Sequence, residues 1–323
     1  MQCSFKKPAS FRRVFFPAFV LCFYHQLALH CQVSRTRPKG LFFLKMNPLR
    51  SLASIALASL ALAGEPQSCP SDSPLSCHNT TVVENTCCFI TSGQLLQTQF
   101  WDTDPATGPS DSWTIHGLWP DYCDGTYPAN CDSSRAYTNI TEIIASQAGN
   151  STLAYMDKYW KDQQGNDESF WEHEWSKHGT CISTLEPDCY QNYEPTEEAT
   201  AYFEKTIALF KTLPTYQWLS DAGITPSDSD TYALEDIQAT LKQQHGAEVT
   251  LGCKNGQLNE VWYHFNVRGS LQDGEFVASE PDGTKGTCPD QVTYAVKGGQ
   301  NSFTRKNRVF KGYREHGTAE MHI

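Results

Sequence analysis

Alternation of apolar and polar residues predicts strands in two parts of the chain. Residues 95–101 (LLQTQFW) and 113–116 (WTIH) carry β-branched and aromatic side chains on either side of a loop of Pro, Gly, Asp and Ser. Residues 248–253 and 260–267 alternate in the same way, and Asn255-Gly256 between them is typical of a hairpin turn. We therefore expect four strands in an antiparallel sheet.

Helical spacing of apolar residues predicts five helices, over residues 140–148, 153–160, 168–178, 197–213 and 234–244. In the fourth segment, Ala201, Ile207 and Phe210 fall on one side, and Gly246 follows the fifth as a stop signal. No internal repeat or interdomain linker interrupts this pattern. The sequence thus predicts an α+β fold: a single domain with a central antiparallel sheet flanked by helices.

The two ends of the chain differ from this domain. Residues 1–63 contain nine Lys and Arg but no Asp or Glu, and residues 46–63 combine a charged start, an apolar stretch and an Ala-x-Ala end. We interpret 1–63 as a leader, with a secretory signal peptide at 46–63. The part before Met46 is either a second, weaker leader or the product of a start codon placed too early. Residues 293–323 are basic and irregular, which indicates a tail after a domain at 64–292.

The leader has one apolar run at residues 14–23 and another within residues 46–63. Neither reaches the roughly 18 to 20 residues that a membrane-spanning helix requires, so no membrane segment is expected. Behind the leader, 16 basic and 36 acidic residues remain, a formal charge of −20 with His neutral. Proteins that coat nucleic acid neutralise phosphates with clustered Lys and Arg. The charge therefore excludes that class, and any contact with nucleic acid must be a local site.

Ten of the 13 cysteines lie behind the leader, and an even number in a secreted chain indicates disulfides. Spacing alone does not give their pairing. The absence of Cys-x-x-Cys pairs argues against structural zinc. Sequons at Asn79, Asn139 and Asn150 predict glycosylation, in keeping with secretion.

A first candidate cluster is WTIHGLWP at residues 113–120. His116 ends the short predicted strand, and Gly117 is expected to let the backbone turn directly after it. Trp119, Asp121 and Tyr127 follow, and two aromatic faces with a carboxylate can sandwich and hydrogen-bond a nucleobase. The alternative is that these side chains only pack the core and its loops.

A second cluster is FWEHEWSKHGTC at residues 170–181. On a helix, His173 and Lys177 lie one turn apart, as do Glu174 and His178, so four ionisable groups share one side. The alternative is a solvated helix with ion pairs. Interleaved aromatic residues disfavour it, because they anchor the helix in a core: Phe170, Trp171 and Trp175.

A zinc protease motif is not expected in this cluster. The HExxH motif places its histidines four residues apart, whereas His173 and His178 are five apart, about 140° around a helix, so no shared metal is predicted. Histidines with a glutamate and a lysine are suited to general acid-base catalysis at phosphorus. RNA carries its own nucleophile, the 2′-hydroxyl, and needs one imidazole as base and another as acid.

The two clusters resemble the active-site segments of the ribonuclease T2 family, especially its fungal members, and the resemblance extends from about Cys69 to Cys288. It implies a catalytic trio of His116, Glu174 and His178. His178 would be the base and His116 the acid, although these roles could be exchanged. His173 and Lys177 would contact the phosphate and stabilise the transition state.

The resemblance also implies two base pockets and a set of disulfides. The main pocket would use Trp119, Asp121 and Tyr127, and the second would use Gln99, residues 161–164 including Gln164, and Phe170. The implied disulfides are Cys69 with Cys88, Cys77 with Cys123, Cys87 with Cys189, Cys131 with Cys181, and Cys253 with Cys288. Cys87 and Cys88 could exchange partners.

Together these features predict a secreted, metal-independent endoribonuclease without a cofactor. It would cleave single-stranded RNA through 2′,3′-cyclic phosphates to 3′-phosphates, with low base specificity and at acidic pH. RNA is the expected partner, and a monomer without an obligate protein partner is expected. The alternatives are a binding protein that keeps the fold without catalysis, a metal-dependent phosphodiesterase, and a vacuolar rather than extracellular enzyme.

Overall fold

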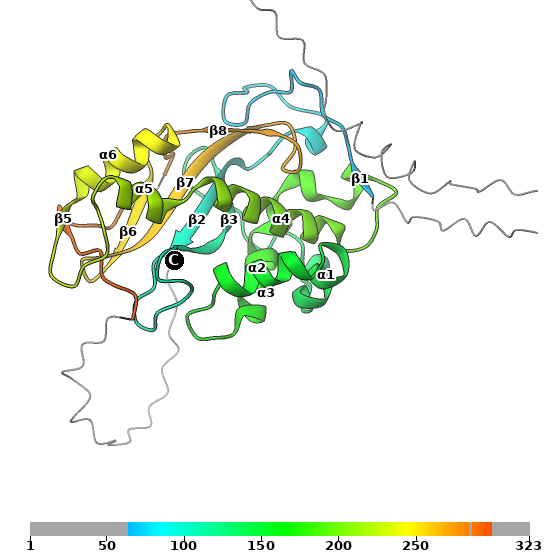
Figure 1. Ribbon diagram of the computed structural model, residues 1–323. Helices are drawn as coiled ribbons and strands as arrows, with labels where there is room; N and C mark the ends of the chain where they lie inside the picture. Colours follow the sequence, from blue (N-terminus) through cyan, green and yellow to red (C-terminus); the bar gives the residue numbers. More distant parts are fainter. Residues whose placement is uncertain (1–63, 284–285, 299–323) are drawn as a thin grey trace, which may run out of the picture. The chain divides into compact units, whose positions relative to one another are not determined.

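A five-stranded antiparallel sheet forms the centre of the computed structural model, which describes residues 64–283 and 286–298 (Figure 1). Four strands lie in the order β3 (Thr114–Tyr122), β2 (Gly93–Phe100), β7 (Gln257–Arg268) and β6 (Thr250–Lys254). β8 (Glu275–Ala278) pairs with the end of β7. The predicted antiparallel sheet is confirmed, and β2 and β7 lie in its centre.

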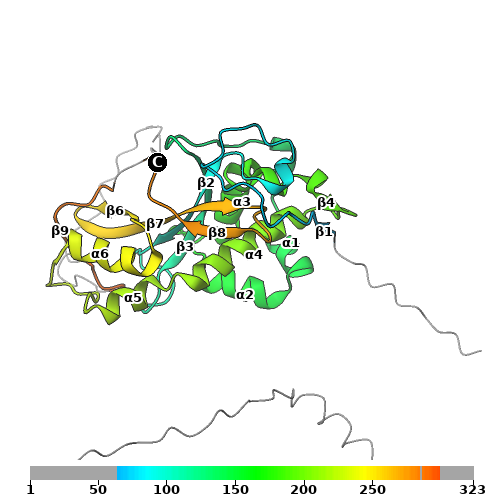
Figure 2. The ribbon, with the colours of Figure 1, turned by 90° about the horizontal axis from the view of Figure 1, so that it is seen from above.

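Helices cover the sheet. They are α1 (Ile140–Gln147), α2 (Asn150–Tyr159), α3 (Asp167–Lys177), α4 (Glu197–Thr212), α5 (Thr215–Asp221) and α6 (Leu234–His245). Figures 1 and 2 show α4, α5 and α6 along one face of the sheet, and α1, α2 and α3 pack against one another beside α4. All five predicted helices are present, so the α+β prediction is confirmed.

Several short elements complete the fold. Two-residue strands pair β1 (Glu65–Pro66) with β4 (Tyr190–Gln191) and β5 (Tyr232–Ala233) with β9 (Gln291–Val292). The 3₁₀ helices are η1 (Thr86–Cys88), η2 (Ser133–Arg135), η3 (Gly179–Cys181), η4 (Ser183–Leu185) and η5 (Pro187–Cys189). β8 and α5 were not predicted, because four and seven residues are too few to establish a period.

The core between sheet and helices is rich in aromatic side chains. Trp171 and Trp175 of α3, Tyr202 and Phe203 of α4, and Tyr263 of β7 are almost completely buried. The predicted anchoring of the 168–178 helix by its tryptophans is therefore confirmed. Burying an aromatic side chain of this size contributes about 1.5 to 3 kcal/mol, so α3 is fixed firmly relative to the sheet.

The outer edge of β3 is capped by side chains of two helices. The Trp160 indole N–H donates to the His116 carbonyl at 2.9 Å. The Tyr202 hydroxyl donates to the Leu118 carbonyl at 3.1 Å and accepts from the Leu118 amide at 3.3 Å. The backbone of this edge strand is thus satisfied without a further strand.

All five implied disulfides are present, with S–S distances between 2.00 and 2.10 Å, and the pairing of Cys87 and Cys88 is the one expected. Cys131–Cys181 joins the segment before α1 to the turn after α3. The segment after Cys69 is tied down by these bonds, since Cys69, Cys77, Cys87 and Cys88 are all bonded.

The predicted leader at 1–63 lies outside the described residues, as do residues 299–323 of the predicted tail. The domain boundary at 292 is too early. Tyr294 has no exposed surface, and the Lys297 ammonium donates to the carbonyls of Thr107, Pro109 and Ser112. The domain therefore reaches at least Lys297. No helix in the described part is long and apolar enough to cross a membrane.

Candidate active site

A bulge in β3 aims His116 into the site. Gln99 of β2 pairs with Ile115, and its neighbour Thr98 pairs with Gly117, so His116 has no partner in the register. An extra residue of this kind changes the alternation of side chains between the two faces. Ile115 and Leu118 consequently enter the core, while His116 and Trp119, also three residues apart, contact each other with ring centroids 4.4 Å apart.

The turn predicted at Gly117 is not present. The chain does not turn there, because β3 continues to Tyr122. A Cβ atom on Gly117 would lie 1.9 Å from Oε2 of Glu174, on the facing helix α3. The glycine is therefore needed for the close approach of that carboxyl group to the strand.

His116 is held on several sides. Its Nδ1 lies 2.8 Å from Oε1 of Glu260 on β7, and its Nε2 lies 3.7 Å from Oε1 of Glu174. The ring stacks on Phe100 with centroids 3.8 Å apart and also approaches Phe170 at 5.7 Å. Only 9% of the His116 side chain is exposed. These contacts restrict both the position and the orientation of the imidazole.

Helix α3 supplies the second half of the site. Asn166 caps its first turn by accepting from the Ser169 amide. Glu174 is completely buried, and the Trp119 indole N–H donates to its Oε2 at 2.8 Å, whereas Oε1 has no hydrogen-bond partner among the described residues. Burial raises the pKa of Glu174 to about 7, more than the nearby His116 and the indole lower it. Below that pH the carboxyl group holds a proton.

His178 is the C-cap residue of α3, and its ring stacks on Trp119 with centroids 5.0 Å apart. Burial, and then the charge of Lys177, lower the pKa of His178 to about 2, so the imidazole is neutral at mildly acidic pH. His173 lies on the exposed side of the cluster, where burial of part of its ring, followed by the charge of Lys177, lowers its pKa. The four ionisable residues of the second motif thus lie together, as predicted.

The helical-wheel argument against a shared metal is not supported by the geometry. His173, Glu174 and His178 each offer a ligand atom within 4.8 Å of the others. His178 is the C-cap residue, and its amide still donates to the Glu174 carbonyl. Its ring centroid nevertheless lies 6.3 Å from that of His173, so five residues of separation do not keep the two rings apart.

The residues predicted for the main base pocket lie at and beyond the end of β3. Trp119 is only 7% exposed and touches His116, His178 and, edge-on, Trp262. Burial raises the pKa of Asp121 to about 7. Tyr127 is exposed. A partly buried acid and an exposed aromatic ring are residue types suited to binding a nucleobase, whereas Trp119 has a second role in holding Glu174.

The second predicted pocket is only partly assembled. Gln99 has no exposed surface, and its amide is bonded to Gln97, the Leu213 carbonyl and Thr215, so its prediction as a base-binding residue is wrong. β2 alternates without a break opposite β7, so Gln99 faces the core, while its neighbour Phe100 faces His116. Phe170 lies beside His116, and Gln164 is exposed in the loop before α3.

Three residues around the cluster were not predicted. Glu260 and Trp262 come from β7, more than 140 residues after His116, and Phe100 ends β2. They belong to ordinary alternating strand patterns, which do not mark any residue as part of an active site. Only the register of the sheet, in which Phe100 pairs with Glu260, brings them to His116.

The predicted glycosylation sites are accessible to different degrees. Asn139 and Asn150 are exposed at the starts of α1 and α2, and Asn79 is half-buried with its side chain bonded to Thr81. Glycosylation of the three sites stays a prediction.

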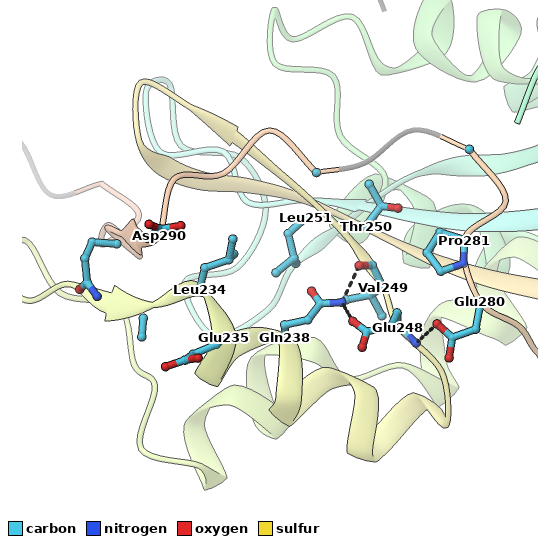
Figure 3. A pocket seen from close by; sticks show the side chains of 14 residues that line it. Leu234, Glu235, Gln238, Glu248, Val249, Thr250, Leu251, Glu280, Pro281 and Asp290 are labelled. Atoms are coloured by element: carbon cyan, nitrogen blue, oxygen red, sulfur yellow. Dashed lines mark hydrogen bonds between the residues drawn. The ribbon is translucent and has the colours of Figure 1, made fainter.

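A hollow of roughly 830 Å³ lies elsewhere, between α6, β6 and the chain around residues 280–291 (Figure 3). Its acidic residues include Glu248, which is bonded to Gln238 and Lys242. None of the predicted catalytic or base-binding residues lines it. Two of the buried side-chain atoms without a hydrogen-bond partner among the described residues, Oε1 of Glu174 and Nδ1 of His178, belong instead to the His116 cluster and favour it as the site.

Comparisons with known proteins identify the family of this chain. A family model described as the Ribonuclease T2 family matches residues 92–275. Ribonuclease Trv of Hypocrea rufa is 73% identical over 231 residues, 72% of this chain and 99% of that protein. Ribonuclease T2 of Aspergillus oryzae is 48% identical over 257 residues, 78% and 93% of the two chains. The crystal structure of Actibind, described as a T2 ribonuclease, has a TM-score of 0.69 at 52% identity and covers 72% of this chain and 99% of that chain.

Proposed function

Because the chain belongs to the ribonuclease T2 family, we propose that it is an endoribonuclease that cleaves single-stranded RNA with His116, Glu174 and His178. The observation that carries the proposal is the pair of imidazoles in unlike surroundings. His116 lies between two carboxyl groups, whereas His178 is buried beside Lys177 with no carboxylate bonded to it. One ring is suited to hold a proton and the other to accept one.

In the first step, neutral His178 removes the proton of the 2′-hydroxyl, whose oxygen attacks the adjacent phosphorus. Protonated His116 gives the proton at Nε2 to the departing 5′-oxygen. The products are a 2′,3′-cyclic phosphate and a free 5′-hydroxyl. In the second step the roles reverse: His116 takes a proton from water, the hydroxyl attacks phosphorus, and His178 returns its proton to the 2′-oxygen. The end product is a 3′-phosphate.

Hydrogen-bond donors of α3 would stabilise the negative charge that develops on the phosphate oxygens. At acidic pH the carboxyl group of Glu174 is protonated, and its Oε1 has no partner among the described groups, so it can donate a hydrogen bond to a phosphate oxygen. Lys177 and His173, next to His178 on the same helix, add positive charge at the open side. Asp121 and Tyr127 would hold the base at low specificity.

Metal independence is part of the proposal. His173, Glu174 and His178 could gather around a cation, but a metal there would block the imidazole that acts as the base. RNA cleavage through its own 2′-hydroxyl needs no metal-activated water. Secretion, with removal of residues 46–63, is proposed from the sequence together with the five disulfides, which form in oxidising compartments.

The test is digestion of RNA by the oxidised protein in EDTA at mildly acidic pH, with the product ends identified by mass spectrometry. Wild-type protein is expected to give cyclic phosphates and then 3′-phosphates, and His116→Phe is expected to give neither. Activity is expected to peak below pH 7, because the acid must be protonated. Cleavage only with added metal would favour a metal-dependent phosphodiesterase at His173, Glu174 and His178, and no cleavage at all would favour a binding protein.

A further inference from the structure

His116 carries a hydrogen bond at the ring nitrogen opposite the one that faces Glu174. Its Nδ1 lies 2.8 Å from Oε1 of Glu260, whose side chain is 13% exposed. Glu260 belongs to β7, which is separated from β3 by β2. The carboxylate therefore reaches across one strand, past Phe100, its direct partner in β2, whose ring covers one face of the imidazole.

The sheet leaves room for this carboxylate. Gly252 of β6 pairs directly with Glu260. A Cβ atom on Gly252 would lie 3.0 Å from Cβ and 3.2 Å from Oε2 of Glu260, closer than a side chain tolerates without movement of its neighbour. The glycine on one side and the Phe100 ring on the other thus keep the Glu260 side chain directed toward His116.

The charges around His116 single out Glu260. The titratable groups that face the ring are Glu260 from β7, Glu174, His173 and His178 from α3, and Asp102 from the β2–β3 loop. Burial lowers the pKa values of the two α3 histidines. Burial raises the pKa values of Glu174 and Asp102, which weakens their charge at acidic pH. Glu260 is the carboxylate in hydrogen-bond contact with the ring.

We propose that Glu260 is the positioning residue of the general acid: its carboxylate accepts the Nδ1 proton of His116, fixes the ring with Nε2 toward the leaving group and stabilises the protonated imidazole. An imidazole that must donate from one nitrogen is commonly oriented by a carboxylate on the other. This inference rests on the proposed function, in which His116 protonates the 5′-oxygen.

The test compares Glu260→Gln, Glu260→Asp and, as matched control, Glu275→Gln on β8, where the carboxylate side chain is 65% exposed and pairs with Arg268. In Glu260→Gln, kcat is expected to fall roughly 10- to 100-fold with KM within about twofold, as for other groups that orient a reacting ligand. The alkaline limb of the kcat/KM profile is expected to move to lower pH. Glu260→Asp keeps the charge, so its alkaline limb is expected to lie close to the wild-type position. The control should match wild type.

A second variant and a second measurement separate positioning from folding. Gly252→Ala leaves every charge in place but crowds Glu260, and it is expected to lower kcat in the same direction. NMR titration of His116 is expected to move to lower pH in Glu260→Gln and to stay unchanged in the control. An unchanged titration and pH limb, with or without lost activity, would overturn the proposal. If wild-type protein cleaves no RNA, the proposed function fails, while the NMR comparison still reports whether Glu260 holds His116.

Discussion

Gly117 shows how a single residue sets the geometry of the site. It is the residue between the two strand positions that contribute His116 and Leu118, and it leaves the space that the Glu174 carboxyl group fills. The Trp119 indole N–H donates to the same Oε2, so a Cβ atom on Gly117 would collide with both partners of this hydrogen bond.

Substituting Gly117 by Ala is expected to displace Glu174 and lower kcat about 100-fold, since a shift of about 1 Å in a catalytic group can have that effect. The measurement is steady-state cleavage of a short RNA together with thermal unfolding. Gly165→Ala is the control, because its new methyl group meets nothing within 4 Å although the positive φ of 87° also makes that position unfavourable for alanine. Equal activity in the two variants would contradict the steric role of Gly117.

At the scale of residues, the sequence predicted what is local. Spacing grouped the residues of α3 within one short motif, and the resemblance to a known family joined them with His116 of the other motif. Glu260 could not be found in this way, because its contact with His116 depends on strand register across more than 140 residues. Gln99 was assigned from the resemblance, and the regular alternation of β2 instead places its side chain in the core, on the face opposite Phe100.

Among the elements, β7 also carries a buried polar link within the sheet. Nδ1 of His264 lies 3.0 Å from Oε1 of Gln94 on β2, and Nε2 lies 2.9 Å from Oγ1 of Thr250 on β6. Burial, and to a lesser degree the nearby His245, lower the pKa of His264 to about 3. The neutral ring satisfies both partners, and an imidazolium could not accept from Thr250.

This link predicts a pH dependence of stability. The folded pKa lies below the unfolded value of about 6.5, so the unfolded chain binds more protons in between. The contribution of His264 to stability is complete above about pH 6.5 and is lost as the pH falls toward 3, by at most about 1.4 kcal/mol per pH unit. Urea unfolding of wild type and His264→Gln from pH 7 to pH 4 should show a smaller loss in the variant. Parallel losses would argue against this role.

The disulfide after α3 predicts a local effect. Removing Cys131–Cys181 by a double alanine substitution is expected to cost up to about 4 kcal/mol, because the bond closes a loop with a separation of 50 residues. It should also lower RNA cleavage at temperatures where the variant is still folded, since Lys177 and His178 lie next to it. The double alanine variant of Cys253–Cys288 is the control, expected to lose stability but to keep its activity while folded.

The sequence predicted those helices and strands that are long enough to show a periodic pattern of apolar residues. The five predicted helices and four strands are present, whereas the seven residues of α5 and the four of β8 were missed. The strand over 113–116 was predicted too short, because Gly117 and Pro120 are ordinary signals for a strand end. Here they occur at an edge strand, where a proline can be accommodated.

At the scale of the whole molecule, the described C-terminal segment closes the domain. Lys297 is 8% exposed, its ammonium is bonded to three carbonyls of the β2–β3 loop, and it lies 4.4 Å from the ring centroid of Trp101. The sequence predicted a basic tail here, because a lysine is rarely buried unless its charge is paired. This prediction concealed the structural role of Lys297.

Lys297→Met is expected to lower the free energy of unfolding by about 1 to 3 kcal/mol, because it leaves buried carbonyls without donors. Lys242→Met is the matched control: that lysine is about half exposed and pairs with Glu248, so its loss should cost less than the loss of Lys297. Denaturant unfolding of both variants provides the comparison. A cost for Lys297→Met no larger than that of the control would show that the buried contacts do not hold the segment.

The capped edge of β3 has a consequence for the behaviour of the protein in concentrated solution. A strand with free amides and carbonyls along its outer side is a template on which another chain can extend the sheet, and such pairing leads to aggregation. Here the indole of Trp160 and the hydroxyl of Tyr202 occupy the groups of His116 and Leu118 that would begin this pairing. The strand that carries His116 is thereby protected from intermolecular sheet formation.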